Sequence, residues 1–224
     1  MKPLPAPIEG VLFDLDGTLL DSAPDLHAAL AAYCAEVGAP VPDYPVVREV
    51  VSRGSRAILR CAFNESDEAL LARTPRYLEL YRDMLATHTR PFDGVAPLLA
   101  TIEARALRWG IVTNKPGFLT DALVERMGWH PRASAVVSGD TLTVKKPDPA
   151  PVLLACGQAR IDPARSVFVG DDARDVEAGR AAGLYTVAVR WGYLDGGDPG
   201  DWGADAVLDH PRELAALLGP QVVA

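Results

Sequence analysis

Two aspartates, Asp14 and Asp16, lie one residue apart and are followed directly by Gly17 and Thr18. They come after a largely apolar run over residues 8–13, which predicts a strand. In the turn after such a strand, both carboxylates can face one crevice. One carboxylate can then attack phosphorus while the other transfers a proton, and both can lie near a divalent cation. The stretch therefore suits phosphoryl transfer.

Further polar residues follow apolar runs or open a helical segment downstream. They are Thr113 and Asn114, then Lys145 and Lys146, and finally Asp171, Asp172 and Asp175. A hydroxyl can bond a phosphoryl oxygen, and a fixed lysine can offset the charge of a phosphate. Carboxylates are the ligands that hard cations such as Mg²⁺ prefer. These residues add the remaining parts of a phosphoryl-transfer site.

The four groups, in this order, resemble the motifs of the haloacid-dehalogenase-like hydrolase superfamily, and within it the phosphatases with a helical cap. The resemblance implies that Asp14 is the nucleophile and that hydrolysis passes through an aspartyl-phosphate. It implies that Asp16 is the general acid and base, with a backbone carbonyl that contacts Mg²⁺. Asp171 is then a direct ligand, so the expected metal residues are Asp14, Asp16 and Asp171.

The same resemblance gives roles to the remaining motif residues. Thr113 and Asn114 are expected to bind the substrate phosphate. Physics alone does not separate Lys145 from Lys146, but the family places its lysine directly before Pro-Asp-Pro, which selects Lys146. Asp172 stands where many relatives have serine, and it is expected to support the metal through water. Asp175 is expected to orient Lys146, with a simple helix N-terminal charge as the alternative.

Strands and helices alternate along most of the chain. Strands are predicted over residues 8–14, 108–112, 135–137, 166–169, 185–189 and 206–208. Short apolar strands separated by helices indicate an α/β fold with a Rossmann-like, doubly wound parallel sheet. In such sheets the ligand site lies beyond the carboxyl ends of the strands, where the four motifs fall.

An all-helical insertion is predicted after the first strand. We expect residues 1–20 and 91–224 to form the α/β core domain and residues 21–90 to form a helical cap domain. Within the cap, Pro45 and Pro75 are expected to break the helices. A Gly-containing turn over residues 52–55 carries Arg53, which could bind a carboxylate of the substrate. The alternative is a solvent-exposed connection between helices.

Composition limits the partners. The chain has 224 residues and a net charge of -8, an acidic balance that disfavours nucleic acid. No run of about 18 apolar residues is present, and the N-terminus lacks a signal-peptide pattern, so we expect no membrane partner and a cytoplasmic location. Three cysteines with no CxxC spacing argue against a disulfide framework. The expected partner is a small-molecule phosphate ester, and the protein is expected to be a monomer or homodimer.

Two phosphatase families compete for the substrate. Residues 138–141 and 145–151 look like phosphoglycolate phosphatases, whereas residues 88–94, 202–205 and 209–211 look like N-acetylmuramic acid 6-phosphate phosphatases of cell-wall recycling. Both substrates carry a carboxylate, and phosphoglycolate is the leading prediction. Other readings are a sugar phosphomutase, a haloacid dehalogenase and a non-catalytic binding module. The acidic metal residues disfavour the dehalogenase, and no core motif is missing, which disfavours the binding module.

Overall fold

A six-stranded parallel sheet forms the centre of the computed structural model, which describes residues 2–219. Its strands are β1 (Gly10–Phe13), β4 (Arg108–Val112), β5 (Ala135–Val137), β6 (Ser166–Gly170), β7 (Tyr185–Val189) and β8 (Ala206–Leu208). Their order across the sheet is β5-β4-β1-β6-β7-β8, and each neighbouring pair is parallel. The predicted Rossmann-like doubly wound sheet is confirmed, with strand ends within two residues of the predicted ones.

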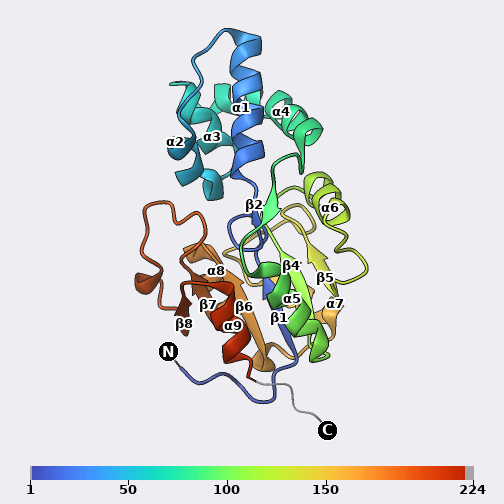
Figure 1. Cartoon of the computed structure of the whole chain (residues 1–224). Helices are drawn as coiled ribbons and strands as arrows, with labels where there is room; N and C mark the ends of the chain where they lie inside the picture. The colour runs from blue at the N-terminus through green and yellow to red at the C-terminus, as the bar shows by residue number, and fades with distance from the viewer. Residues whose placement is uncertain (1, 220–224) are drawn as a thin grey trace.

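Helices cover both faces of this sheet. On one face α5 (Val95–Ala104) and α9 (Pro211–Leu217) pack together, and on the other α7 (Ala150–Ala159) and α8 (Ala173–Ala181) do so (Figure 1). The helix α6 (Gly117–Arg126) follows β4. The side chains of β1 alternate between the two faces of the sheet, so helices on both faces have apolar residues to pack against. Val11 and Phe13 belong to one apolar cluster and Leu12 to the other, so the whole strand is apolar.

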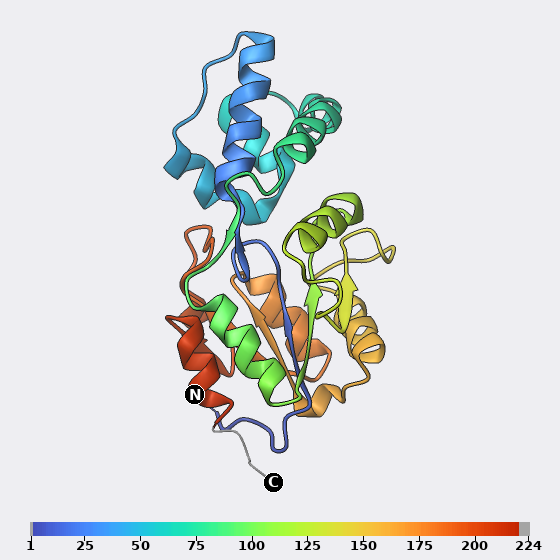
Figure 2. The same cartoon turned by 45° about the vertical axis from the view of Figure 1, so that its right-hand side comes forward.

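A separate group of helices lies beyond the carboxyl ends of the strands. It contains α1 (Ala23–Val37), α2 (Tyr44–Glu49), the short 3-10 helix η1 (Val51–Arg53), α3 (Ser55–Ala62) and α4 (Asp67–Met84). Figure 2 shows this group, called the cap below, standing above the sheet as a layer of its own. The helices α1 and α4 pack against each other and bury apolar residues between them, including Leu30, Leu70 and Tyr77.

The chain enters and leaves the cap through two very short strands. They are β2 (Leu20–Asp21) and β3 (Arg90–Pro91), which pair antiparallel. Sequence reasoning found no strand here, because two residues are too few to show an alternating pattern. The predicted division into residues 21–90 and the flanking core falls close to this pair, and independent folding of the two parts stays a prediction.

Pro75 lies inside α4, so the predicted helix break at this residue is wrong. A proline in a helix interior removes a hydrogen bond and costs about 3 kcal/mol. Two features offset that cost. Leu71, whose carbonyl loses its partner, lies on an exposed part of the helix, where water can reach it. Tyr77 and Tyr81, which follow the proline, are fully buried and hold the second half of the helix against the protein.

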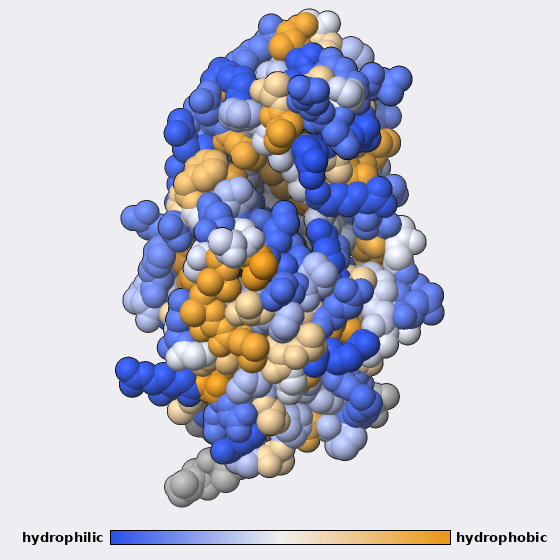
Figure 3. All heavy atoms as spheres, turned by 180° about the vertical axis from the view of Figure 1, so that it is seen from behind, coloured by the Kyte–Doolittle hydropathy of each residue, from blue (hydrophilic) through white to orange (hydrophobic). Residues whose placement is uncertain are grey.

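Hydrophilic residues cover much of the face seen from behind, and a recess separates the cap from the sheet below it (Figure 3). Large exposed apolar residues are few among residues 2–219 and are scattered over several elements. In the same part of the chain, no helix is both long and apolar enough to cross a membrane.

Candidate active site

Three strands that are neighbours in the sheet deliver the predicted motifs to one place. Asp14 follows β1, Thr113 follows β4 and Asp171 follows β6, and β1 lies between the other two strands. The backbone N–H of Asp14 donates to the carbonyl of Val169 at 2.9 Å, and that of Thr113 donates to Val137 at 2.9 Å. The sheet register therefore fixes both residues at its carboxyl edge, as the sequence predicts.

Lys146 lies between two carboxylates of this site. Its Nζ is 2.8 Å from Asp14 Oδ1 and 2.7 Å from Asp175 Oδ1, and it donates to the carbonyl of Val112 at 2.7 Å. Burial alone would lower the pKa of Lys146, but the charges of Asp14 and Asp175 outweigh it and raise that pKa. The lysine is therefore a fixed positive charge. Lys145, in contrast, is exposed.

Asn114 fixes the backbone of Lys146. Its side-chain Nδ2 donates to the Lys146 carbonyl at 2.9 Å, and its Oδ1 accepts from the Lys146 N–H at 3.0 Å. Thr113 is buried, and its Oγ1 accepts from the backbone N–H of Lys115 at 3.1 Å. Both residues line the cavity of the site. Their contact with a phosphate stays a prediction.

Asp171 is held from two sides and is almost fully buried. Thr18 Oγ1 donates to its Oδ1 at 2.7 Å, and the backbone N–H of Tyr193 donates to its Oδ2 at 2.8 Å. Gly17 has a φ of 86°, and a Cβ at that position would come within 2.0 Å of Asp171 Oδ2. Only glycine both adopts this backbone and leaves room for the carboxylate. The sequence marks residues 191–193 as a possible lining of the site entrance, but it does not predict this contact of Tyr193 with Asp171, 22 residues away.

Among the described residues, Asp14, Asp171 and Asp175 form a group in which one oxygen of each lies within 4.8 Å of the others. Burial, and then the charges of Asp14 and Asp175, raise the pKa of Asp171 well above its ordinary value. Asp14 Oδ1 is buried and accepts no hydrogen bond, although Lys146 Nζ is near. The group contains three carboxylates, and the ammonium of Lys146 lies between two of them. The group therefore fits a small, hard cation such as Mg²⁺.

The carboxylate of Asp16 lies outside this group. Its Oδ1 accepts from Ser22 Oγ at 2.5 Å, and its Oδ2 is 3.0 Å from Lys115 Nζ. The acidic group thus contains Asp175 where the sequence suggests Asp16. The resemblance assigned a metal contact to the backbone carbonyl of Asp16, which this arrangement of its side chain does not test. Sequence reasoning missed Ser22 and Lys115, although Lys115 directly follows the Thr113-Asn114 motif.

Asp172 caps α8 and pairs with an arginine. Its side chain and that of Asp175 form a reciprocal capping box, and Arg174 Nη2 lies 2.6 Å from Asp172 Oδ2. Burial would raise the pKa of Asp172, but Arg174 outweighs it and lowers that pKa. Arg174 also donates to the carbonyl of Ser52 in the cap, at 2.7 Å. The predicted support of a metal by Asp172 stays a prediction.

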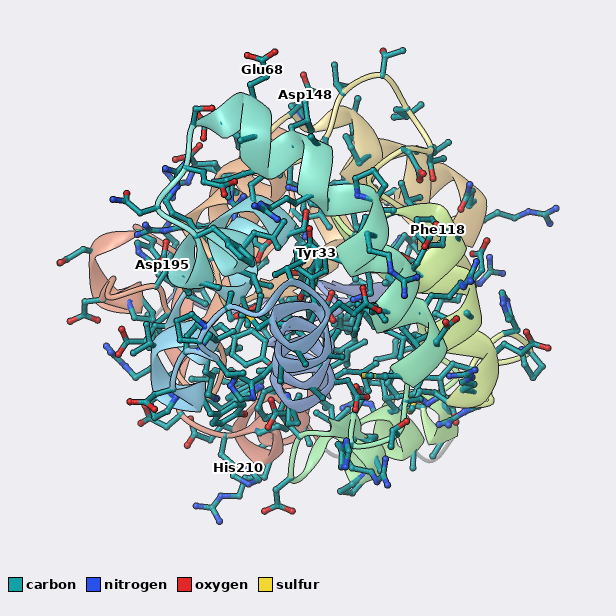
Figure 4. The ribbon with its side chains drawn as sticks, turned by 90° about the horizontal axis from the view of Figure 1, so that it is seen from above. Tyr33, Glu68, Phe118, Asp148, Asp195 and His210 are labelled. Carbon is teal, nitrogen blue, oxygen red and sulfur yellow. The ribbon has the colours of Figure 1, made fainter. Side chains whose placement is uncertain are left out.

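The cap and the core together line a partly open cavity of about 280 Å³ that Asp14 also lines. Arg53 lines it, but its guanidinium donates to Asp195 on a core loop. Seen from above, Asp195 lies at one side of the cap helices, and Phe118 lies on α6 at the other side (Figure 4). Arg56 lines the same cavity and forms no ion pair or hydrogen bond with the rest of residues 2–219. The cap also contributes apolar lining residues: Leu26, Val51, Ile58, Tyr77, Leu78 and Tyr81.

The comparisons with known proteins agree with this geometry. A family model described as haloacid dehalogenase-like hydrolase matches residues 11–189. The chain belongs to this family. It is 47% identical over 214 residues to the N-acetylmuramic acid 6-phosphate phosphatase of Pseudomonas aeruginosa, covering 94% of this chain and 95% of that protein. It is 45% identical over 206 residues to a phosphoglycolate phosphatase of Xanthomonas campestris, covering 91% and 93%.

Solved structures of this haloacid dehalogenase-like hydrolase family share the fold. The crystal structure of a predicted phosphoglycolate phosphatase from Haemophilus somnus aligns with a TM-score of 0.82 at 24% identity, covering 92% of this chain and 96% of that one. This likeness shows the shared fold. The family model and the curated relatives confirm the predicted family and the predicted class of enzyme. The protein is a phosphatase that hydrolyses phosphoric monoesters.

Proposed function

We propose that this phosphatase depends on Mg²⁺ and hydrolyses a small phosphate ester that carries a carboxylate. The observation that carries the proposal is the position of Asp14. It faces a cavity between cap and core, beside a buried lysine and a group of carboxylates that fits a cation. A cavity of about 280 Å³ between cap and core suits a small molecule better than a large polymer. The cytoplasmic location and a monomeric or homodimeric state remain part of the proposal.

In the proposed reaction, the side chains act in two steps. Asp14 attacks phosphorus, the bond to the ester oxygen breaks, and Asp16 gives that oxygen a proton. Water then attacks the aspartyl-phosphate, and Asp16 takes a proton from it, which releases phosphate and restores both carboxyl groups. Lys146 and Thr113, which line the same cavity as Asp14, would contact the phosphoryl oxygens. Mg²⁺, held by Asp14 and Asp171 with Asp175 beside them, would neutralise the negative charge that gathers there.

The substrate carboxylate is proposed to bind Arg53. Both curated relatives are named for substrates with a carboxylate, phosphoglycolate and N-acetylmuramic acid 6-phosphate. 2-Phosphoglycolate is the broader candidate. The second candidate has one specific observation in its favour. A cavity of about 280 Å³ with apolar cap residues is larger than phosphoglycolate needs and suits a sugar with acetyl and lactyl groups.

The metal part of the proposal is testable without activity. Mg²⁺ should raise the melting temperature of the wild type in a concentration-dependent way, because a ligand that binds only the folded state stabilises it. The variant Asp171→Asn should lose this shift, while Asp140→Asn should keep it, because Asp140 does not belong to the acidic group. Equal shifts in wild type and Asp171→Asn, or full turnover in excess EDTA, would contradict the metal site.

A comparison of kcat/KM for the two proposed esters and for glucose 6-phosphate tests the substrate class. We expect one or both carboxylated esters to exceed the uncharged sugar phosphate by at least about 10-fold, which corresponds to about 1.4 kcal/mol of selective binding. A preference for glucose 6-phosphate would remove the carboxylate from the proposal. Turnover that requires a sugar bisphosphate would indicate the phosphomutase alternative.

A further inference from the structure

Lys115 is a buried lysine at the boundary between cap and core. Its Nζ lies 3.2 Å and 3.0 Å from the two carboxylate oxygens of Asp16 and donates to Tyr81 Oη on α4 at 2.9 Å. The same Nζ lies 4.6 Å from the centre of the Tyr81 ring. An ammonium group is costly to bury unless it is paired and hydrogen-bonded. Here Asp16 supplies the opposite charge, and Tyr81 supplies a further acceptor.

The backbone of Lys115 is fixed as firmly as its side chain. Its N–H donates to Thr113 Oγ1 at 3.1 Å, and its carbonyl accepts from the N–H of Gly139 at 2.8 Å. The backbone of Lys115 is therefore fixed three residues after the end of β4. Asp16 has one other side-chain partner, Ser22 Oγ, in the part of the chain that the structure describes. Without Lys115, this single hydroxyl would hold the carboxyl group.

Lys146, the other buried lysine of the site, has different partners and a different role. Lys146 pairs with Asp14 and Asp175, and so it supplies the charge next to the phosphorus site. Lys115 pairs with Asp16, the carboxyl group that the proposed function assigns to protonating the ester oxygen. The two buried lysines thus serve different carboxylates. Because Lys146 already supplies the positive charge beside Asp14, the role of Lys115 must be sought in its own partner, Asp16.

From these contacts we propose that Lys115 is a positioning residue for Asp16, and that it fixes the orientation in which this carboxyl group meets the leaving oxygen. The proposal rests on the proposed function, in which Asp16 is the general acid. Tyr81, on the cap, accepts a hydrogen bond from the ammonium of Lys115, which belongs to the core. The orientation of the Asp16 carboxyl group therefore depends on one residue of the cap and one of the core. The loss of Lys115 should then affect proton donation to the leaving group more than attack by Asp14.

The test compares kcat/KM for two esters in wild type and Lys115→Met. One is whichever proposed alkyl ester the wild type hydrolyses faster, whose alkoxide needs a proton to leave. The other is 2,4-dinitrophenyl phosphate, whose leaving group needs none. General acid catalysis contributes about 10²- to 10⁴-fold, so we expect a loss near the lower end, about 100-fold, for the alkyl ester and less than about 5-fold for the aryl ester. Lys115→Arg should recover part of the loss.

Lys145→Met is the matched control, because Lys145 lines the same cavity but is exposed and unpaired in the described chain. It removes the same charge and should change both esters by less than about 3-fold, a difference below 1 kcal/mol. Equal losses for the two esters in Lys115→Met would overturn the proposal. The proposal would also be overturned if Lys145→Met lost as much kcat/KM for the alkyl ester, relative to the aryl ester, as Lys115→Met does.

Asp16→Asn distinguishes a failure of this proposal from a failure of the proposed function. If Asp16→Asn lowers kcat/KM more for the alkyl ester than for the aryl ester and Lys115→Met does not, only the proposal for Lys115 is wrong. If Asp16→Asn loses both esters equally, the acid role itself is wrong and both fall. In the double variant, the loss of Lys115 should add less than about 3-fold to that of Asp16→Asn, because residues that act as one unit are not additive. Multiplied losses would contradict the proposal.

Folding is checked in the same variants. Tyr81→Phe keeps the ring and removes one acceptor of the lysine. Because the ion pair with Asp16 remains, it should show the same preference for the aryl ester at a smaller size, about 3- to 10-fold, which is the net contribution of a typical hydrogen bond. Circular dichroism and melting temperature identify a variant that does not fold. If Lys115→Met does not fold, Lys115→Gln and Tyr81→Phe decide the proposal by the same ratio of the two esters.

Discussion

Asp14 has neighbours of both charges, with Lys146 Nζ 2.8 Å from its Oδ1 and two further carboxylates close by. The change Asp14→Asn keeps the shape of the side chain and removes the nucleophile. We expect turnover to fall by about 10⁴-fold or more, as for other covalent nucleophiles. The melting temperature should stay the same or rise, because one of three crowded negative charges is gone. Steady-state kinetics and a thermal melt check this, and residual activity above 1% would contradict the role.

The two adjacent lysines should differ sharply. Lys146→Ala removes the partner of buried Asp175 and of partly buried Asp14. Breaking a buried pair costs about 3–5 kcal/mol of folding stability. Lys146→Ala should also lower kcat by at least about 10²-fold, because the phosphoryl charge loses its fixed counter-charge. Lys145→Ala should change stability by less than about 0.5 kcal/mol, as exposed substitutions do. Urea unfolding and kinetics measure both, and the reverse order would mean that Lys145 is the functional lysine.

Sequence motifs predicted the residues that follow strands, such as Asp14 and Asp171, because their positions depend on a local signal. They did not predict residues whose surroundings come from distant segments. Lys115 lies 99 residues from Asp16 and 34 from Tyr81, and nothing in a single sequence shows those contacts. Arg53 was expected at the site and does line the cavity, but its pairing with Asp195 could not be read from a turn pattern.

At the scale of elements, burial on both faces made the strands easy to predict. A strand such as β6 is buried throughout, so its sequence is a short apolar run bounded by polar residues. The elements that escaped prediction depend on tertiary contacts. Pro75 is tolerated because α4 is anchored on both sides of it, by Leu70 and by Tyr77. The pair β2–β3 forms because the cap brings residues 20–21 and 90–91 together.

The entry to the cap depends on one buried carboxylate, that of Asp25 in the first turn of α1. It accepts from the backbone N–H groups of His88 and Thr89 at 2.8 and 2.9 Å, and from Thr89 Oγ1 at 2.6 Å. Burial would raise the pKa of Asp25, but the bonds from Thr89 and His88 outweigh it and lower that pKa. Asp25 therefore ties the start of α1 to the segment that leads back to β3.

We expect Asp25→Asn to lower the free energy of unfolding at pH 7 by about 2–4 kcal/mol, because buried donors lose a charged acceptor. A lowered pKa gives stability that is complete above the ordinary carboxyl pKa and is lost as the pH falls through the folded pKa. The difference between variant and wild type should therefore shrink below about pH 4, where the unfolded carboxyl group becomes protonated. Urea unfolding at several pH values measures it, with the exposed Asp43→Asn as control. A difference that does not change with pH would contradict the account.

At the scale of the whole molecule, the cap and the core meet through a few polar contacts around the turn at residues 52–54. Ser52 Oγ donates to the carbonyl of Tyr193 at 3.1 Å, and Arg48 lies over the Tyr193 ring, 4.9 Å from its centre. Arg53 pairs with Asp195 on the same core loop, with 58% of the arginine side chain exposed. An ion pair this exposed is worth only about 0.2–1 kcal/mol. A carboxylate in the cavity could therefore take the place of Asp195.

If a substrate carboxylate replaces Asp195 at Arg53, substitutions of Arg53 and of Asp195 should have opposite effects. Arg53→Ala should lower kcat/KM for the carboxylated ester by about 10- to 100-fold, since a hydrogen bond to a charged group contributes about 1.5–3 kcal/mol. The value for p-nitrophenyl phosphate, which has no carboxylate, should change much less. Asp195→Asn removes the competitor for Arg53, so it should lower KM for the carboxylated ester, by no more than about 5-fold given the weak pair it breaks. If the pair only holds the cap in place, both variants should instead lose activity alike on both esters, and Arg53 would have no part in selecting the substrate.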